Sequence, residues 1–277
     1  MSSSVPRVAL ADGTAIDVVG YGVYKVPPAD TAHLCSTALD AGYRLLDTAA
    51  LYGNEAGVGE AARAYLETGD REDLFVTSKV WNDDHGFDAT LRAFDASMDL
   101  LGLDRLDLYL IHWPCPTKDL YVETWRALER LQAEGRVRAI GVSNFQRPHL
   151  ERLLAETGVV PVLNQIELHP YLQQHDLRSF HERHGIATQA WSPLGRGNVL
   201  QDPVVGRITA ELGRTPAQVI LRWHLQHGIL TIPKASSRER ISSNLDIFGF
   251  ALDDAHLAAL DALDRDQRFG SHPDRVG

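Results

Sequence analysis

The sequence predicts an α/β protein, and three observations favour a (β/α)8 barrel. Eight short apolar runs, rich in β-branched and aromatic residues, recur along the 277 residues, as expected of parallel strands covered on both faces. Helical patterns of apolar residues lie between these runs. Strands and helices alternate at intervals of roughly thirty residues, which is typical of a TIM barrel. An open, doubly wound sheet is the alternative architecture.

The predicted strands are nearly continuous in their apolar character. They cover residues 21–26, 44–49, 74–80, 106–113, 137–144, 159–168, 185–192 and 228–234. Before them, residues 5–17 predict an N-terminal β-hairpin that turns at Asp12 and Gly13. We expect this hairpin to plug the bottom of the barrel.

Three of the intervening segments show apolar residues at helical spacing. Residues 90–102 and 122–135 each place four apolar side chains on one face. Residues 214–228 are the clearest case, because Thr215 and Gln218 stand at the spacing of a capping box. We interpret these apolar stripes as packing faces.

The segment GVGEAA, residues 57–62, matches the glycine pattern of dinucleotide-binding turns. That fingerprint needs an apolar strand directly before it and an acidic residue about 20 positions later. Here the preceding residues are polar, and the next strand ends in Lys79. We therefore reject this interpretation and expect the glycines to let a helix begin close to the barrel.

The composition, 44% hydrophobic and 23% charged, is that of an ordinary globular protein. The formal net charge is −10 without any basic run, which argues against nucleic acid as a partner. No apolar run approaches the ~20 residues that span a membrane, and residues 1–10 lack the apolar stretch of a signal peptide. We expect a cytoplasmic monomer with one domain over residues 1–277 and no metal site.

Polar residues stand at the carboxyl ends of the predicted strands, where barrels of this kind carry their chemistry. They are Asp47, Lys79, His112, Ser143, Asn144, Asn164, Gln165, Glu167, Trp191, Ser192 and Lys234. A single buried histidine or lysine is more often structural than catalytic. Many polar groups at one rim need partners, however, because isolated buried charges are costly.

Tyr52 follows Asp47 by five residues, so it can lie over the same rim. A free tyrosine has a pKa of about 10 and is a poor acid at neutral pH. We expect the Lys79 ammonium to lower the pKa of Tyr52. Asp47 would hold the lysine, and His112 would orient a bound carbonyl. These four residues predict a proton donor for carbonyl reduction.

Eight motifs along the chain resemble those of the aldo-keto reductase superfamily. They are GYGVYKV, DTAALYGNEAGVG, TSKVWN, YLIHWP, GVSNF, NQIELHP, WSPLG and IPKASSRERISSN, in this order over essentially the whole chain. The segments SHPDRVG and TPAQVILRWHLQ are similar to the bacterial 2,5-diketo-D-gluconic acid reductases. The resemblance implies an NADPH-dependent barrel that reduces small aldehydes, α-dicarbonyls or keto-sugar acids without a metal.

The resemblance also implies roles for single residues. The implied catalytic residues are Asp47, Tyr52, Lys79 and His112, and the implied substrate-binding residues are Tyr24, Trp81, His112 and Trp113. The implied cofactor-binding residues are Ser143, Asn144, Gln165, Trp191, Ser192, Leu194, Gly195, Lys234, Ser236, Arg240 and Asn244. Among these, Trp191 would stack on the nicotinamide.

The sequence departs from the family pattern at Ala235, where a serine or threonine is usual. Lys234 and Arg240 imply a preference for NADPH, because they can pair with its 2′-phosphate. One lost hydroxyl contact costs about 1 kcal/mol. The resemblance therefore implies that NADPH is preferred but that some NADH is used.

Two other functions remain open from the sequence. Lys79 at a barrel rim can be the Schiff-base lysine of a lyase, although this leaves the cofactor-like residues unexplained. The chain can also bind NADPH without turnover, as a redox sensor or interaction protein.

Overall fold

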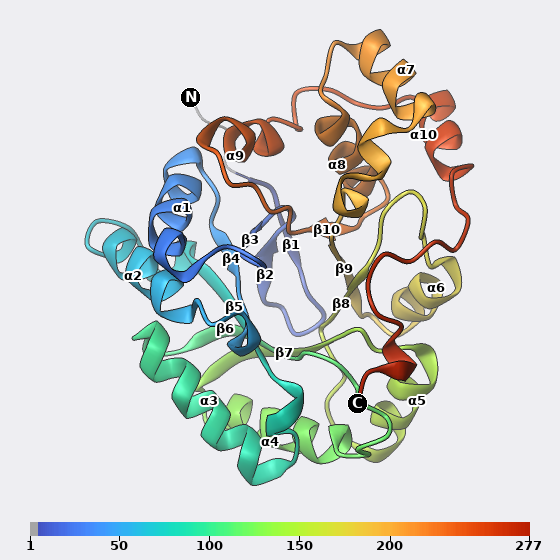
Figure 1. Cartoon of the computed structure of the whole chain (residues 1–277). Helices are drawn as coiled ribbons and strands as arrows, with labels where there is room; N and C mark the ends of the chain where they lie inside the picture. The colour runs from blue at the N-terminus through green and yellow to red at the C-terminus, as the bar shows by residue number, and fades with distance from the viewer. Residues whose placement is uncertain (1–4) are drawn as a thin grey trace.

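The strands of the protein close into a barrel, seen along its axis in the computed structural model (Figure 1). The structure describes residues 5–277; residues 1–4, part of the stretch in which we expect no signal peptide, lie outside it. One parallel sheet has the order β10-β9-β8-β7-β6-β5-β4-β3. Its two edges meet through a parallel bridge between Val19 and Thr231. The open-sheet alternative is therefore wrong.

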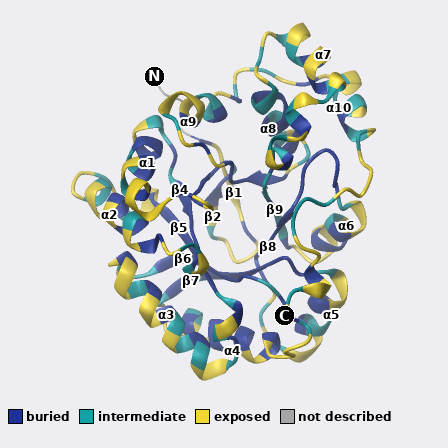
Figure 2. Ribbon diagram, in the orientation of Figure 1, coloured by how far each residue is buried: buried dark blue, intermediate teal, exposed yellow. Residues whose placement is uncertain are grey.

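All eight predicted strands are confirmed in shortened form. They are β3 (Tyr21–Gly22), β4 (Leu45–Asp47), β5 (Phe75–Val80), β6 (Leu106–Ile111), β7 (Val137–Ser143), β8 (Leu163–Glu167), β9 (Ala187–Trp191) and β10 (Leu230–Thr231). Every residue of β4, β5, β6 and β8 is buried, because helices cover the sheet outside and side chains fill it inside. Figure 2 shows buried strands inside a ring of helices whose outer faces are exposed.

A short antiparallel hairpin, β1 (Arg7–Ala9) and β2 (Ala15–Asp17), precedes the barrel. It turns at Gly13, whose φ of 85° suits a residue without Cβ. Leu10 and Ile16 belong to a buried cluster that includes the first residues of four barrel strands. The hairpin therefore closes the bottom of the barrel, as predicted.

The helices surround the sheet (Figure 1). They are α1 (Pro28–Ala41), α2 (Glu55–Leu66), α3 (Phe87–Leu101), α4 (Tyr121–Ala133), α5 (Arg147–Glu156), α6 (His175–Arg183), α7 (Pro203–Leu212), α8 (Pro216–Gln226), α9 (Arg238–Leu245) and α10 (Asp254–Asp261). The three predicted helices correspond to α3, α4 and α8. The capping box of α8 is present: Gln218 N donates to Thr215 Oγ1 at 3.2 Å, and Thr215 N donates to Gln218 Oε1 at 3.0 Å.

The glycines of GVGEAA lie inside α2, which begins at Glu55. A Cβ at Gly59 would lie 2.1 Å from the Leu101 backbone oxygen, and a Cβ at Gly57 would lie 2.9 Å from Thr31 Cβ. These glycines therefore let α2 pack closely against α3 and α1, and not against the barrel as we expected. Being inside a helix, they form no phosphate-binding turn.

Candidate active site

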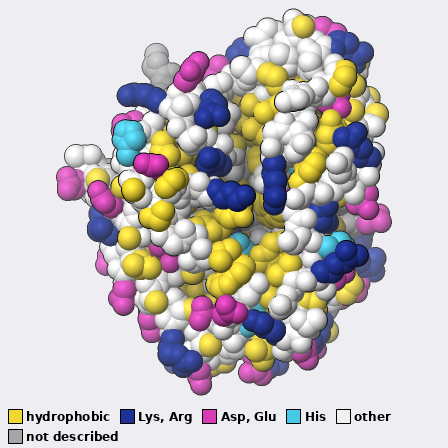
Figure 3. Space-filling model, viewed as in Figure 1, with side chains coloured by type: hydrophobic (Ala, Val, Ile, Leu, Met, Phe, Trp, Pro, Cys, Tyr) yellow, Lys and Arg dark blue, Asp and Glu magenta, His cyan; other side chains and the backbone are white. Residues whose placement is uncertain are grey.

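A cavity of about 500 Å³ opens at the carboxyl ends of the barrel strands. Figure 3 shows it as a hollow with largely hydrophobic walls and with Lys and Arg side chains at its edge. Barrels of this kind carry their active sites at this end, and a concave, mostly apolar pocket with a few polar groups is typical of small-molecule sites. The cavity is therefore the candidate active site.

Most of the predicted site residues line this cavity. The lining includes Tyr24, Asp47, Tyr52, His112, Trp113, Ser143, Asn144, Gln165, Trp191, Ser192, Leu194 and Lys234. Six other predicted residues are not part of the lining: Lys79, Trp81, Gly195, Ser236, Arg240 and Asn244. No helix of residues 5–277 is long and apolar enough to cross a membrane, and no group of potential metal ligands occurs among these residues.

Lys79 and Asp47 form a buried ion pair below the cavity. Lys79 is 0% exposed, and its Nζ donates to Asp47 Oδ1 and to the Thr48 carbonyl oxygen, both at 2.7 Å. Gln165 Nε2 donates to the other Asp47 oxygen at 2.7 Å. Burial lowers the pKa of Lys79, and Asp47 opposes this shift. Both Asp47 oxygens and two of the three Lys79 N–H groups are thus hydrogen-bonded, and such bonds are what stabilise a buried pair.

Tyr52 lies directly above this pair. Its ring centroid is 5.2 Å from Lys79 Nζ and 5.6 Å from the His112 ring centroid. Burial raises the pKa of Tyr52 well above 10, and Asp47 and Tyr24 push it in the same direction. The expected lowering by Lys79 is therefore wrong for this structure, since Asp47 offsets the lysine charge and burial dominates. Tyr52 is held as the protonated phenol.

His112 is neutral at the same rim. Burial lowers its pKa well below 6.5, and the nearby Lys79 acts in the same direction. Its Nδ1 is buried without a hydrogen-bond partner in the described part of the chain. Trp81 packs edge-on against the imidazole, with ring centroids 5.1 Å apart. A neutral imidazole can donate one hydrogen bond to a carbonyl oxygen without carrying a charge.

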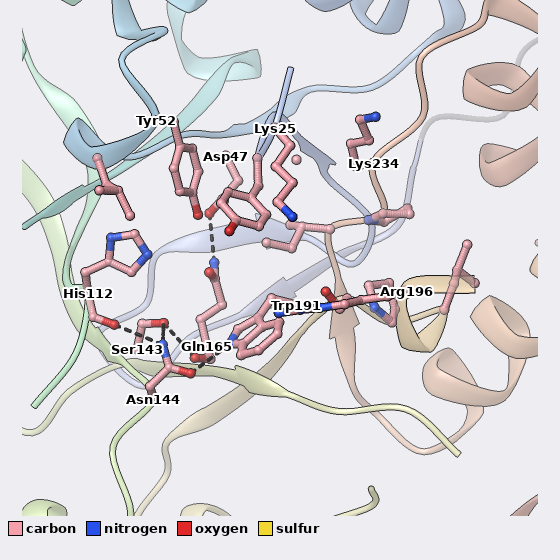
Figure 4. A pocket seen from close by; sticks show the side chains of 18 of the residues that line it. Lys25, Asp47, Tyr52, His112, Ser143, Asn144, Gln165, Trp191, Arg196 and Lys234 are labelled. Atoms are coloured by element: carbon pink, nitrogen blue, oxygen red, sulfur yellow. Dashed lines mark hydrogen bonds between the residues drawn. The ribbon is translucent and has the colours of Figure 1, made fainter. Parts of the chain in front are cut away.

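Polar side chains at the ends of β7 to β9 hold one another in place (Figure 4). Trp191 Nε1 donates to Asn144 Oδ1 at 2.8 Å, and Asn144 Nδ2 donates to the His112 carbonyl oxygen at 3.0 Å. Ser143 Oγ donates to the Gln165 carbonyl oxygen at 2.8 Å. These bonds fix the orientation of the Trp191 indole in the wall of the cavity.

Three cations, Lys25, Arg196 and Lys234, also line the cavity. In Figure 4, Arg196 and Lys234 lie on the far side of Trp191 from His112. None of the three forms an ion pair with a residue of the described range 5–277. Unpaired cations that gather in one cavity of a chain with net charge −10 indicate an anionic ligand.

Sequence reasoning missed Lys25 and Arg196 as site residues. The scarcity of lysine, four in the whole chain, was a signal for Lys25, since it lies near the carboxyl end of the predicted strand 21–26. Arg196 carried no such signal. Its place depends on the left-handed backbone of its loop, where φ is 54°.

The predicted cofactor residues that follow Lys234 differ in exposure and in the hydrogen bonds that they already form. Arg240 is exposed, and within residues 5–277 its guanidinium donates only to hydroxyls, to Ser236 Oγ at 3.1 Å and Ser237 Oγ at 3.2 Å. Asn244 is buried in α9. Ala235 is 5% exposed and belongs to the hydrophobic core. A hydroxyl at that position would therefore have little room to reach the cavity.

The model of the Aldo/keto reductase family matches residues 18–265. The chain belongs to the aldo/keto reductase family. An aldo-keto reductase of Mycolicibacterium smegmatis is 51% identical over 269 residues, which is 97% of each protein. The glyoxal reductase of Bacillus subtilis is 48% identical over 271 residues, covering 97% of this chain and 96% of that protein.

Among solved structures, a variant of Gox0644 in complex with NADPH is similar to this chain. Its TM-score is 0.95 at 48% identity, and the match covers 99% of this chain and 100% of the other. The family resemblance predicted from the motifs is therefore confirmed. The finer likeness to 2,5-diketo-D-gluconic acid reductases stays a prediction.

Proposed function

We propose that this aldo/keto reductase reduces small carbonyl compounds to alcohols with NADPH, and that Tyr52 donates the proton. One observation carries the proposal: the Tyr52 and His112 rings lie 5.6 Å apart beside the buried Lys79–Asp47 pair. Burial raises the pKa of Tyr52 and lowers that of His112, which favours the neutral form of both. The NADPH complex of the similar Gox0644 variant supports the choice of cofactor.

The cavity fits NADPH because its cations have no protein partner among the described residues. Lys25, Arg196 and Lys234 would hold the phosphates by charge-assisted hydrogen bonds. Trp191 offers a fixed aromatic face, and the carboxamide of Gln165 a polar edge, to the nicotinamide. Ser143, Asn144, Ser192, Leu194, Gly195, Ser236, Arg240 and Asn244 are proposed contacts as well. When bound, NADPH supplies the hydride.

Four residues would act on the substrate carbonyl. His112 and Tyr52 donate hydrogen bonds to the carbonyl oxygen, which fixes its position between their rings. As negative charge grows on that oxygen, Tyr52 passes its proton to it. The Lys79 ammonium then faces a phenolate and stabilises it, while Asp47 keeps the ammonium in place. The raised pKa of Tyr52 keeps the proton on the tyrosine until the oxygen becomes charged.

We further propose that the substrates are small aldehydes, α-dicarbonyls and keto-sugar acids such as 2,5-diketo-D-gluconate. Tyr24 and Trp113 line the cavity, and Trp81 lies behind His112, so contacts to the substrate are mainly aromatic. The similarity to a glyoxal reductase supports the α-dicarbonyls, whereas the diketo-acid rests on two sequence segments. The cytoplasmic location, the monomer, the single domain and secondary use of NADH stay predictions.

The Schiff-base alternative is disfavoured by the position of Lys79. Its Nζ is 0% exposed, does not line the cavity, and already donates to Asp47 and Thr48. A Schiff-base lysine must reach the substrate carbonyl as a free amine. The non-catalytic sensor is left as the alternative, and turnover distinguishes it from a reductase.

The test follows the loss of NADPH absorbance with purified protein and a panel of methylglyoxal, an aromatic aldehyde and 2,5-diketo-D-gluconate. The matched variant is Tyr52→Phe, which keeps the ring and removes the proton. We expect turnover to fall by at least about 100-fold while NADPH still binds. Full turnover by Tyr52→Phe would overturn the proton-donor role, and no turnover by the wild type despite NADPH binding would favour the sensor.

A further inference from the structure

A buried carboxylate at the end of β8 has partners more than a hundred residues away in the sequence. Glu167 is 0% exposed, and its Oε1 accepts from Phe269 N at 2.7 Å. Gly270 N lies 3.1 Å from Oε1 and 3.0 Å from Oε2. Two successive backbone N–H groups of the segment 268–277 therefore bind a single side chain.

This carboxylate is the segment's one backbone anchor in the described structure. The remaining backbone hydrogen bonds of residues 268–277 are local, such as Arg275 N to the His272 carbonyl oxygen at 3.0 Å. Further contacts come from side chains: Arg268 Nη1 lies 3.8 Å from Glu167 Oε2, and His149 Nε2 lies 3.5 Å from Asp274 Oδ1. Loss of the anchor would leave residues 268–277 without a backbone hydrogen bond to the barrel. The segment would then be held by its side chains and by Gln267 just before it, whose N donates to the Tyr171 carbonyl oxygen at 2.9 Å.

The anchored residues touch the walls of the active-site cavity. A Cβ at Gly270 would lie 2.4 Å from Trp191 Cη2, so the backbone there rests on the indole. A Cβ at Gly195 would lie 3.2 Å from Phe269 Cε2, so Phe269 packs against the loop that follows β9. The next residue along, Ser271, itself lines the cavity.

Glu167 stays ionised in this position. Burial alone would raise its pKa, but hydrogen bonds from His169, Phe269 and Gly270 outweigh burial, and the pKa is lowered. Backbone N–H groups bind an ionised carboxylate more strongly than a neutral acceptor. The anchor therefore holds throughout the neutral pH range.

We propose that Glu167 is a positioning residue for substrate selection, which acts by holding the segment 268–277 against Trp191. The inference rests on the proposed reductase function, because it concerns which carbonyl compounds fit beside the indole. Glu167 does not line the cavity, so its effect on substrates must pass through the segment. Release of the segment would open the Ser271 side of the cavity and admit bulkier substrates.

The test compares Glu167→Gln with Glu60→Gln, an exposed glutamate on α2 without an ion pair in the described structure. Glutamine keeps the size of the side chain and one acceptor oxygen, but it loses the charge, and its Nε2 cannot accept from Gly270 N as Glu167 Oε2 does. Hydrogen exchange read at the Phe269 and Gly270 amides should become at least about tenfold faster in Glu167→Gln only. Unchanged exchange at both amides would overturn the anchor, and this reading needs no turnover.

Kinetics then test the consequence for substrates. In Glu167→Gln the ratio of kcat/KM for an aromatic aldehyde to that for methylglyoxal should rise at least about fivefold, through KM. A merely structural role would lower kcat for both substrates alike and leave the ratio unchanged, which would overturn the proposal. Failure of the wild type to reduce either substrate would refute the reductase function instead, while the exchange data still decide the anchor.

A second variant keeps the Glu167 charge. In Gly270→Ala the new Cβ would meet Trp191 Cη2 at 2.4 Å and Glu167 Oε2 at 2.9 Å, so the segment must move away from both. We expect the same shift of the substrate ratio as in Glu167→Gln. This variant also covers the case in which Glu167→Gln does not fold, and an unchanged ratio in folded Gly270→Ala would contradict the proposal.

Discussion

The mouth and the bottom of the barrel differ in whether cations are left without a carboxylate partner. At the bottom, cations and carboxylates are matched: Arg7 pairs with Asp17 at 2.8 Å, and Arg71 pairs with Asp107 at 2.9 Å. At the mouth the buried Lys79 is paired with Asp47, but Lys25, Arg196 and Lys234 face the cavity without an ion pair in the described chain. Paired charges at the bottom serve stability, whereas unpaired cations at the mouth can bind a ligand. The difference locates function more directly than any one residue does.

The two ends of the barrel also differ in which residues adopt a left-handed backbone. All non-glycine residues with positive φ in the described chain, except Asp266, lie in loops that follow a barrel strand: Lys25, Cys115, Asp119, Asn144, Gln174, Ser192 and Arg196. Loops that lead from a helix into a strand place glycine at such positions, at Gly42, Gly102, Gly135, Gly185 and Gly228. A left-handed residue other than glycine costs about 1 kcal/mol. These strained residues lie in the loops at the mouth. Among those with charged or amide side chains, Lys25, Asn144 and Arg196 line the cavity.

The largest expected effect follows from breaking the buried pair at the mouth. Lys79→Met leaves Asp47 buried without its cation, which should lower the free energy of unfolding by about 3–5 kcal/mol. Loss of the ammonium beside Tyr52 should also reduce kcat by at least about 100-fold. Urea unfolding and initial rates measure the two effects. The control is Lys118→Met, since Lys118 pairs with the exposed Asp83 and such pairs contribute about 0–1 kcal/mol. Equal effects from both variants would show that burial of the pair is irrelevant.

Breaking an ion pair at the bottom should lower the free energy of unfolding without lowering activity. Asp107 is 0% exposed, and Arg71 at 2.9 Å is nearer to it than its other cation, Arg138 at 3.9 Å. Arg71→Met should therefore cost up to about 3 kcal/mol of unfolding free energy. Because this pair lies at the end opposite the cavity, kcat and KM should remain within about twofold of the wild type. A large fall in kcat of the folded variant would contradict the division of labour between the two ends.

Removing one unpaired cation should weaken cofactor binding and leave the free energy of unfolding nearly unchanged. Arg196→Met should raise KM for NADPH about tenfold, because a charge-assisted hydrogen bond to phosphate is lost. Unfolding free energy should change by less than about 0.5 kcal/mol, since no protein partner is left behind. The matched control is Arg92→Met, an exposed arginine on α3 without an ion pair in the described structure. The difference in KM for NADPH between the two variants should become smaller at high ionic strength. An unchanged KM in Arg196→Met would show that Arg196 does not bind the cofactor.

The fold could be predicted from the sequence because its physical causes are local. Strands covered on both faces must be apolar, and each needs a helix before the next parallel strand can form. Polar residues at strand ends then stood out, and Asp47 and His112 indeed lie at the cavity. The runs were longer than the strands, since apolar residues continue past the last ladder hydrogen bond.

What could not be predicted depends on packing between distant segments. The pKa of Tyr52 moves upward and not downward, because burial outweighs a lysine already paired with Asp47. Arg196 reaches the cavity only through a left-handed loop. The partners of Glu167, the amides of Phe269 and Gly270, lie more than a hundred residues away. No pattern of neighbouring residues in the sequence predicts such long-range contacts.

The smallest expected effect concerns Ala235, the residue after Lys234. The family pattern places a hydroxyl where this chain has Ala235, which suggests that Ala235→Ser would strengthen the preference for NADPH. In the structure the Ala235 side chain is 5% exposed in the core, and its carbonyl oxygen accepts from Tyr21 Oη at 2.6 Å. A serine hydroxyl there has little freedom to turn toward a ligand, so we expect the NADPH to NADH ratio of kcat/KM to rise by less than about threefold, below the effect of a full hydrogen bond. A rise of tenfold or more would mean that the backbone at Ala235 moves when the cofactor binds. The mouth of the barrel would then be less rigid than its bottom.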